Sequence, residues 1–478
     1  MSIQRKLLAY LSNVIHFKDI NVKEALLASS DINPDGTREI TYAEAASVIN
    51  SALLKAAINP NDNNTDIVSF KEIKYFTNIG KLPKNCFKGC NNLKEIICVP
   101  SQINNPTDNS DYSGIFYDCD IEELHLEDFT ELIAGASNVT NGNSKFGKLL
   151  NLKVIYIPSL TKILGLAFVQ SHIPNVEKIV ISSVQQWLDI YTPSMGQNYR
   201  PTAGSSNGNT VKADLYLSTD LEHPITQITT PTQALSGITT QPTIFEFALE
   251  GLKSITDITI GAQNTDVRRS AFRRIPNSVT IHNFDYISKV AADSFYKCKA
   301  QGMTNIPSSI TNVYENSFRE SALQKIESTS LVTISGSNAF TSTPITTIVA
   351  NNITAINSNS VFYQCTSLIS VFLNSLTTFG TSLFKGCNNL QTVSLQSATI
   401  INTSSFYQCS KLTTVDAPNV TQIKEEAFYG CSLLSNINFN LSNATIIQER
   451  AFLNCSLITA PTDYSNLTYI DQKHIIKF

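Results

Sequence analysis

Hydrophobic residues recur along this chain with a period close to 22 residues. The segments 376–395, LTTFGTSLFKGCNNLQTVSL, and 420–439, VTQIKEEAFYGCSLLSNINF, follow the template (L/I/V)-T-x-I-x-x-x-x-F-x-x-C-x-x-L-x-x-V-x-L with small apolar exchanges. The template phenylalanines are Phe247, Phe272, Phe295, Phe318, Phe340, Phe362, Phe384, Phe406, Phe428 and Phe452, with looser copies at Phe87, Phe116, Phe146 and Phe168. A fixed period of this length indicates a repeat architecture.

Each copy predicts the same local elements. The L-x-x-V-x-L run alternates apolar positions, as a short strand with one buried face does. The V-T-x-I run predicts a second short strand or an extended bend, and the F-x-x-C-x-x-L spacing predicts a helical or 3₁₀ turn. One turn cannot close a core alone, so stacked turns must bury the Phe, Cys and Leu columns. We predict an α/β-type solenoid of about 22-residue turns with a parallel β-sheet along one face.

The template resembles the BspA-like (Treponema pallidum-type) leucine-rich repeat family. The resemblance rests on AFYGC at 427–431, on VDAP at 415–418 and on VTQI at 420–423, and it covers about residues 70–470. A loop insertion at about 182–228 also fits the family, which often carries W-x-x-I, LY and ITxI there. The repeat cysteine is replaced at Ser171, Ser321 and Thr343, where a small polar residue must fill the same place.

The resemblance implies a function in binding. Members of this family are typically surface or adhesion proteins of anaerobic bacteria and parasites, or proteins of phages that infect such bacteria. They usually bind rather than catalyse. The sequence starts with Arg5 and Lys6 before LLAYLSNVI but has no clear signal peptide. We therefore expect a bacterial surface or a phage virion location, without deciding between them.

Residues 1–65 lack the repeat and predict a helical N-terminal module, a cap or a docking segment for an assembly partner. Residues 66–478 are the predicted solenoid. Thr41 and Glu44 form a possible capping box. Asp31, Asn33 and Asp35 resemble the start of an EF-hand loop, but position 12 is Tyr42 instead of Glu. A calcium site and a turn stabilised by these polar side chains both remain open.

The ten cysteines occupy repeat positions or isolated places, not paired ligand motifs. We predict buried, inert thiols without disulfides and without a metal centre. The six histidines share no metal-ligand spacing, and no catalytic motif occurs. We therefore predict a protein that is not an enzyme and needs no cofactor.

Composition changes this picture little. Of 478 residues, only 15% are charged, and 35 basic against 39 acidic residues give a net charge of -4. A balance this even argues against nucleic-acid partners, and no apolar run is long enough to predict membrane insertion. The basic run RRSAFRR at 268–274 predicts solvated turn positions, with contact to nucleic acid or an acidic glycan as the alternative.

The predicted binding residues lie at the outward position between the last two apolar residues of the strand template. They are Tyr156, Val180, Thr259, Val349, Phe372, Ser394, Asp416 and Asn438. Solenoids commonly bind partners on such a face, although outward Val and Thr are also simply good strand formers. We expect protein or surface-glycan recognition through this face. The alternative is a structural component of a phage virion or another large assembly, docked through residues 1–65.

Overall fold

The computed structural model describes residues 12–83, 85–103, 115–133, 146, 149–164, 168, 173–191, 200–202, 212–458, 465–466 and 468–470. The chain forms two compact units. The first comprises Met1–Thr226 and Gly251–Ser254, and the second comprises Gln227–Glu250 and Ile255–Phe478. The predicted boundary at residue 65 is not where these units divide, because the helical segment and the first turns belong to one unit.

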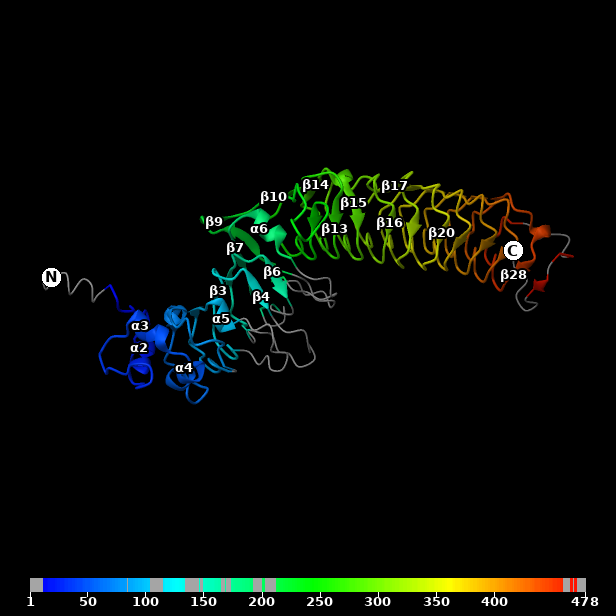
Figure 1. Ribbon diagram of the computed structural model, residues 1–478. Helices are drawn as coiled ribbons and strands as arrows, with labels where there is room; N and C mark the ends of the chain where they lie inside the picture. Colours follow the sequence, from blue (N-terminus) through cyan, green and yellow to red (C-terminus); the bar gives the residue numbers. More distant parts are fainter. Residues whose placement is uncertain are drawn as a thin grey trace. The chain divides into compact units, whose positions relative to one another are not determined.

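From residue 12 on, where the described part of the first unit begins, the first helices are α2 (Ile20–Leu27), α3 (Tyr42–Ser47) and α4 (Ser51–Ile58) (Figure 1). Each begins at a side-chain cap, and the predicted capping box is confirmed. The Glu44 backbone N–H donates to Thr41 Oγ1 at 3.1 Å, and the Thr41 backbone N–H donates to Glu44 Oε2 at 2.7 Å. Leu26 and Leu54 are fully buried, so the apolar faces of α2 and α4 form a small core.

One seven-stranded sheet runs through the first unit. Its order is β1 (Ser69–Phe70), β2 (Glu95–Ile97), β3 (Glu123–His125), β5 (Val154–Tyr156), β7 (Lys178–Ile181), β8 (Asp214–Leu217) and β9 (Asp220–Pro224). All pairs are parallel except β8 with β9, which forms an antiparallel hairpin. The shorter elements are η1 (Lys71–Tyr75), α5 (Pro100–Ile103), β4 (Glu131–Ile133), β6 (Lys162–Leu164) and α6 (Val184–Asp189).

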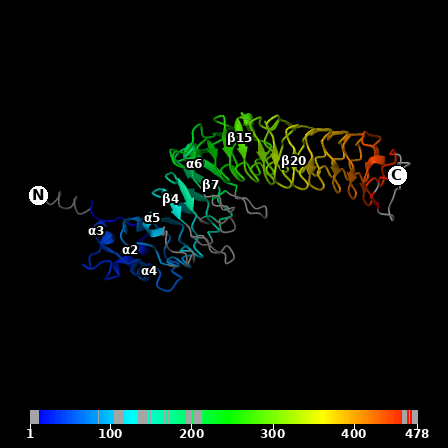
Figure 2. The same ribbon diagram turned by 45° about the vertical axis from the view of Figure 1, so that its right-hand side comes forward.

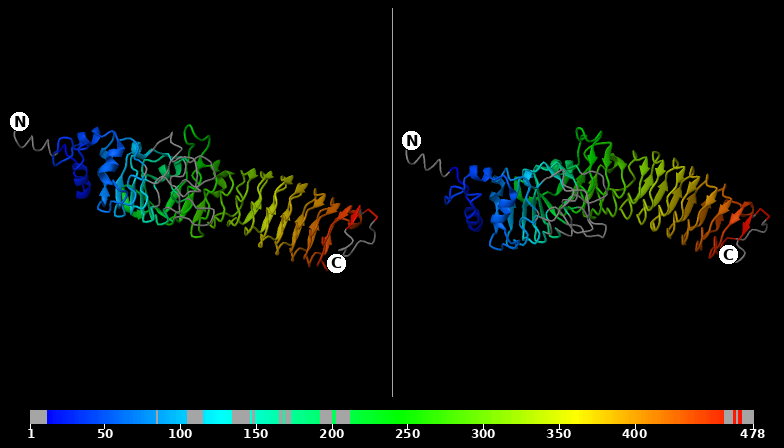
Figure 3. Two further views of the ribbon diagram at one scale, coloured as in Figure 1. Left: turned by 90° about the horizontal axis from the view of Figure 1, so that it is seen from below. Right: turned by 60° about the horizontal axis from the view of Figure 1, so that its bottom comes forward.

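The second unit stacks turns that each contribute to two rows of strands (Figures 2 and 3). The first row contains β10 (Gln227–Thr229), β12 (Asp257–Thr259), β14 (Thr280–His282), β17 (Lys325–Glu327), β19 (Thr347–Val349), β21 (Ser370–Phe372), β23 (Thr392–Ser394), β25 (Thr414–Asp416) and β27 (Asn436–Ile437). The second contains β11 (Thr243–Ile244), β13 (Thr265–Val267), β15 (Ile287–Val290), β16 (Asn312–Val313), β18 (Thr333–Ile334), β20 (Ala355–Ile356), β22 (Thr378–Phe379), β24 (Ile400–Ile401), β26 (Gln422–Ile423), β28 (Ile446–Ile447) and β29 (Tyr469–Ile470). The predicted parallel solenoid and its second short strand are confirmed. Two 3₁₀ turns, η4 (Phe284–Tyr286) and η5 (Leu441–Asn443), complete the elements.

Phenyl rings form a continuous column inside the second unit. From Phe272 to Phe452, successive template rings are stacked with centroids 4.7–5.6 Å apart. This distance is close to the spacing of about 4.8 Å between neighbouring strands, so one ring per turn fills the core without a gap. In the first unit, the centroids of successive rings from Phe87 to Phe168 are 5.7–6.4 Å apart. The wider separation agrees with the less regular sequence spacing of these copies.

The thiols line the same interior. All ten cysteines are free and buried, so the prediction of buried thiols without disulfides is confirmed. Each regular thiol bonds the phenylalanine carbonyl of the preceding turn, as Cys387 Sγ does with Phe362 O at 3.1 Å. Thr343 fills a cysteine position and makes an equivalent bond within its own turn, from Oγ1 to Phe340 O at 2.7 Å. Ser321 is also buried, and Ser171 lies outside the described residues.

The predicted helical or 3₁₀ turn after each phenylalanine is present as single i→i+3 hydrogen bonds and not as a continuous helix. Cys365 N–H donates to Phe362 O at 3.4 Å, and Leu368 N–H donates to Cys365 O at 3.0 Å. Left-handed conformations, with φ between 52° and 77°, occur two residues before and two residues after the ring in every turn from Phe272 to Phe452. Most of these residues are not glycine, as Ser382 and Gln408 illustrate. The backbone is also bonded to the next turn, since Phe362 N–H donates to Leu383 O at 3.0 Å. These bends let about 22 residues close one turn.

The interruption at 182–228 is only partly an exposed loop. It contains α6, β8 and β9, and β8 continues the sheet of the first unit beside β7. Arg200, which lies within the predicted loop insertion, is fully buried and donates to Trp187 O at 2.6 Å and to Ile190 O at 2.8 Å. Residues 192–199 and 203–211 lie outside the described residues.

Candidate binding faces of the strands

The structure brings four of the predicted binding residues into one row. Val349, Phe372, Ser394 and Asp416 are register partners on β19, β21, β23 and β25. Asn438 follows β27 directly, and its backbone N–H donates to Val415 O at 3.3 Å. We call these five residues the strand face. Their function in binding stays a prediction.

The other three predicted residues lie elsewhere. Thr259 is on β12, in a separate three-stranded sheet of the second unit. Tyr156 and Val180 are register partners on β5 and β7 of the first unit. The eight predicted binding residues share one template position in the sequence, but the fold places them in or next to three different sheets.

Two residues of the predicted column do not face solvent. Val180 is only 1% exposed, because the larger side chains of Tyr156 and Tyr216 flank it on the neighbouring strands. Ser394 is 7% exposed, because its hydroxyl is bonded to Asn374 and Asp416. The expectation of accessible side chains is wrong at these two positions.

A hydrogen-bond network fixes the Asp416 carboxylate on the strand face. Oδ2 accepts from Ser394 Oγ at 3.3 Å and from Gln396 Nε2 at 3.2 Å, and Oδ1 accepts from Asn438 Nδ2. Asn438 is held in turn by the Ala417 backbone N–H, which donates to its Oδ1 at 2.6 Å. No salt bridge to Asp416 occurs within the described part of the chain. Neutral donors thus hold a negative charge in a fixed position at the surface.

Apolar side chains lie near this carboxylate along the strand face, with Phe372 two strands away from Asp416. Phe372 is 39% exposed and Ile369, directly before the same strand, is 45% exposed. Val349 on the preceding strand is half-buried. Isolated apolar residues are normal at surfaces. A phenyl group in the same row as a preorganised carboxylate, however, offers both area to bury and a directional polar contact.

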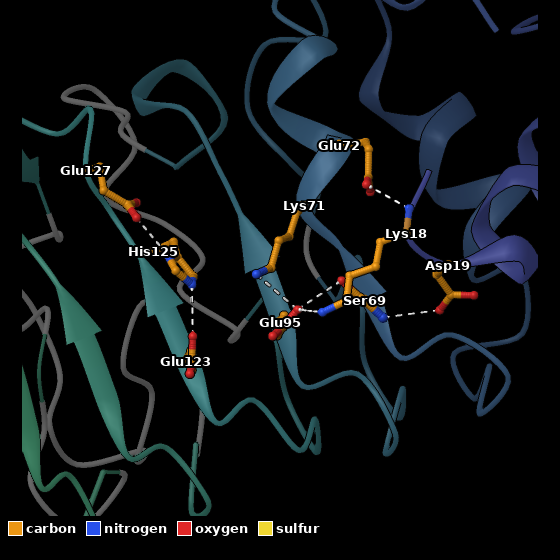
Figure 4. A network of polar contacts seen from close by, with 9 residues as sticks. All are labelled: Lys18, Asp19, Ser69, Lys71, Glu72, Glu95, Glu123, His125 and Glu127. Atoms are coloured by element: carbon orange, nitrogen blue, oxygen red, sulfur yellow. Dashed lines mark hydrogen bonds and ion pairs between the residues drawn. The ribbon is translucent and has the colours of Figure 1, made fainter. Parts of the chain in front are cut away.

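A second polar network lies on the sheet of the first unit (Figure 4). Glu95 Oε2 contacts Lys18 Nζ at 2.6 Å and Lys71 Nζ at 3.1 Å. Burial opposes ionisation of Glu95, but the hydrogen bonds from Lys18 and Lys71 outweigh it and lower its pKa. Asp19 accepts from the backbone N–H of Ser69 at 3.1 Å while it caps α2. These contacts fasten the helical segment to the first strands, which supports the interpretation of that segment as a cap.

His125 belongs to the same network. Its Nδ1 lies 2.6 Å from Glu127 Oε1 and its Nε2 lies 3.2 Å from Glu123 Oε2, and its ring stacks on Tyr156 with centroids 4.2 Å apart. Only a ring that carries both protons donates to both carboxylates. Burial raises the pKa of Glu127, but the hydrogen bond from His125 lowers it by more. The pKa of Glu127 therefore lies below its ordinary value. The E-L-H-L-E spacing at 123–127 is the signal for this cluster, because alternate residues of an extended chain lie on one face.

The polar turn at 31–36 uses its side chains for its own backbone. Asp35 Oδ1 accepts from the Thr37 N–H at 3.0 Å, which lowers the pKa of Asp35. Asn33 donates to Leu27 O at 3.1 Å and to Thr37 O at 3.0 Å. Among the residues that the structure describes, no group of three His, Cys, Asp or Glu side chains is arranged to hold a metal. The contacts are those that the turn interpretation predicts.

The basic run 268–274 does not form one patch. Arg268 pairs with Asp266 at 3.3 Å and Arg269 pairs with Asp293 at 3.0 Å. On the other side of Phe272, Arg273 and Arg274 approach the fully buried Glu250 at 3.7 and 3.5 Å. Each cation therefore has an acidic neighbour, which makes a general attraction for nucleic acid weak here.

The chain belongs to the BspA type leucine-rich repeat family. The family model, described as BspA type Leucine rich repeat region, matches in 6 copies over residues 64–192, 242–369 and 358–475. This makes the chain a leucine-rich repeat protein of a type that generally binds partners. Within the described residues no helix is both long and apolar enough to cross a membrane.

Three solved structures are similar in part. A Treponema pallidum leucine-rich repeat protein is 20% identical, with 34% of this chain and 81% of that chain covered and a TM-score of 0.29. Leucine-rich repeat proteins from Bacteroides ovatus (19% identity, 69% and 85% covered, TM-score 0.34) and Eubacterium ventriosum (16% identity, 73% and 80% covered, TM-score 0.31) also match. No curated protein matches the sequence.

Proposed function

We propose that this protein is a recognition or adhesion protein that binds a protein or a surface glycan through the strand face. The observation that carries the proposal is the row that joins exposed Phe372 to the fixed carboxylate of Asp416. A partner that fits this row presents an apolar group beside a cation or a hydrogen-bond donor.

Burial and charge contribute differently to such an interface. Covering the exposed parts of Phe372 and Ile369 contributes roughly 25 cal/mol per Å² of apolar area. Aromatic residues near the centre of an interface commonly dominate its affinity. Asp416 contributes specificity, because Ser394, Gln396 and Asn438 hold it in place before the partner arrives. Little side-chain entropy is then lost on binding.

The proposal is tested with the full chain immobilised and exposed to bacterial-host surface extracts and glycan arrays. Phe372→Ala and Asp416→Asn are expected to reduce retention of a bound partner at least about tenfold, by loss of an aromatic contact and of a charge. Val332→Ala is the matched control, because Val332 is 47% exposed and adjoins β18 in the other strand row. If both strand-face variants bind as the control does, or if nothing is retained by the unaltered chain, the proposal is wrong.

The alternative, a component of a virion or another assembly docked through residues 1–65, stays a prediction. Its test is incorporation of a chain in which Ile49, a residue between α3 and α4 that is 78% exposed, is replaced by Asp. Unchanged incorporation would count against docking through this module.

A further inference from the structure

A groove opens in the second strand row where its regular pairing is interrupted. A cavity of about 540 Å³ is lined by Asp266 on β13, Ser288 and Lys289 on β15, Asn312 at the start of β16, and by Arg268 and Tyr314. This volume lies within the range of roughly 300–1,000 Å³ of small-molecule sites. The groove lies entirely within the second unit and away from the strand-face residues.

An irregularity in the strands produces the groove. Thr265 pairs with Ile287 but Asp266 pairs with Lys289, so Ser288 is an extra residue in β15. The sheet of β11, β13 and β15 ends there, and β16 begins another sheet. Bulges of this kind redirect side chains and are common beside functional sites. The period of 23 residues between Phe272 and Phe295, one above the regular 22, accommodates this extra residue.

Charge in the groove favours an anion. Two cations, Arg268 and Lys289, face one carboxylate, Asp266, which leaves a net charge of +1. Arg268 uses Nη2 for Asp266 at 3.3 Å, and its Nε has no hydrogen-bond partner among the described residues. A guanidinium has five N–H donors. Because Nε is buried and Nη2 already contacts Asp266, the donors that a ligand can use are the remaining ones on the two Nη atoms. Burial raises the pKa of Asp266, against the effect of Arg268 and Lys289, so the site disfavours its own negative charge.

The remaining lining resembles a sugar site more than a peptide site. Tyr314 is 44% exposed and offers an aromatic face on which the apolar side of a pyranose ring can pack. Thr311 and Asn312 add a hydroxyl and an amide to the lining, and such groups both donate and accept, as sugar hydroxyls do. The Ser288 hydroxyl donates to Thr265 O and keeps only its capacity to accept. Arg–carboxylate pairs are among the strongest charge-assisted contacts.

We propose that this groove binds a carboxylated sugar, a uronic or a sialic acid, with the carboxylate on Arg268 and Lys289 and the ring against Tyr314. The site is separate from the strand face, so either proposal can fail without the other.

The test is titration calorimetry of the full chain with three sugars and one acidic peptide, hexaglutamate. Sialyllactose and a hyaluronan tetrasaccharide carry the carboxylate, and lactose is the neutral match. We expect an acidic sugar to bind and lactose to bind at least about tenfold more weakly, as the loss of a charged hydrogen bond predicts. Equal binding of lactose and acidic sugars, no binding of either acidic sugar, or binding of hexaglutamate in place of both would overturn the proposal.

Two variants locate the site. Arg268→Gln is expected to weaken acidic-sugar binding at least about tenfold. Arg269→Gln is its matched control, because Arg269 has the same 44% side-chain exposure and also pairs with an aspartate, but does not line the groove. Tyr314→Leu keeps the apolar bulk and removes the aromatic face. It is expected to weaken the binding of both acidic sugars. Equal affinities for Arg268→Gln and Arg269→Gln would place the ligand elsewhere and refute the assignment.

Discussion

Replacing Phe362 by Ala should remove one ring from the middle of the phenyl column. Phe362 is fully buried and stacks on Phe340 at 5.3 Å and on Phe384 at 5.4 Å. Truncating a buried phenylalanine costs roughly 3–5 kcal/mol of unfolding free energy. The two lost ring pairs account for roughly 1–3 kcal/mol of this. We therefore expect a loss of about 4 kcal/mol.

Two variants separate stacking from simple burial. Phe362→Leu keeps most of the apolar volume but has no ring, and it should cost about 1–2 kcal/mol. Phe372→Ala, on the exposed strand face, should cost less than about 1 kcal/mol. Urea unfolding followed by far-ultraviolet circular dichroism measures all three. If Phe362→Ala destabilises no more than Phe372→Ala does, the column does not hold the turns together.

The remaining predictions concern the polar groups and the backbone. Because Lys18 and Lys71 lower the pKa of Glu95, its contribution to stability is present above the unfolded pKa of about 4.3 and is lost as the pH falls through the folded pKa. Glu95→Gln should therefore lower the Tm at pH 7, and the difference should shrink as the pH falls below the unfolded pKa and through the lowered folded pKa. Gln408→Gly should raise the Tm slightly, equivalent to about 0.5–1 kcal/mol, because Gln408 has a φ of 58° where the neighbouring turns carry glycine; a lower Tm would contradict this. Arg200→Gln should shift the emission of the only tryptophan, since the Arg200 guanidinium lies 4.9 Å from the Trp187 ring, and an unchanged spectrum would argue against that contact.

The interior could be predicted from the sequence because burial repeats with the turn. In the regular copies, each of these two template positions holds one residue type, Phe or Cys, at a constant spacing. Stacked turns therefore bury each position in the interior. The left-handed bends could not be predicted, because residues such as Ser382 and Gln408 stand where glycine would have been the signal. There the bonds between neighbouring turns impose a backbone that the local sequence does not favour.

The candidate faces were harder to predict than the core. Alternation along a strand fixes which side a residue faces, but not what lies beside it. Ser394 faces outward and is still covered, because Asn374 and Asp416 come from different turns to bond its hydroxyl. His125 looked isolated in the sequence because its partners Glu123 and Glu127 matter only once a strand aligns them. The groove at Asp266 depends on a single extra residue in β15.

Counting reactive thiols tests the stacked-turn interior most directly. Burial raises the pKa of the Cys298 thiol to about 12, and the described structure has all ten cysteines free and buried. In native buffer at pH 8, a thiol reagent such as Ellman's reagent should label none of them within minutes, and in concentrated urea without reductant it should label all ten. Rapid labelling of several thiols in the native protein, or fewer than ten in urea, would contradict the account.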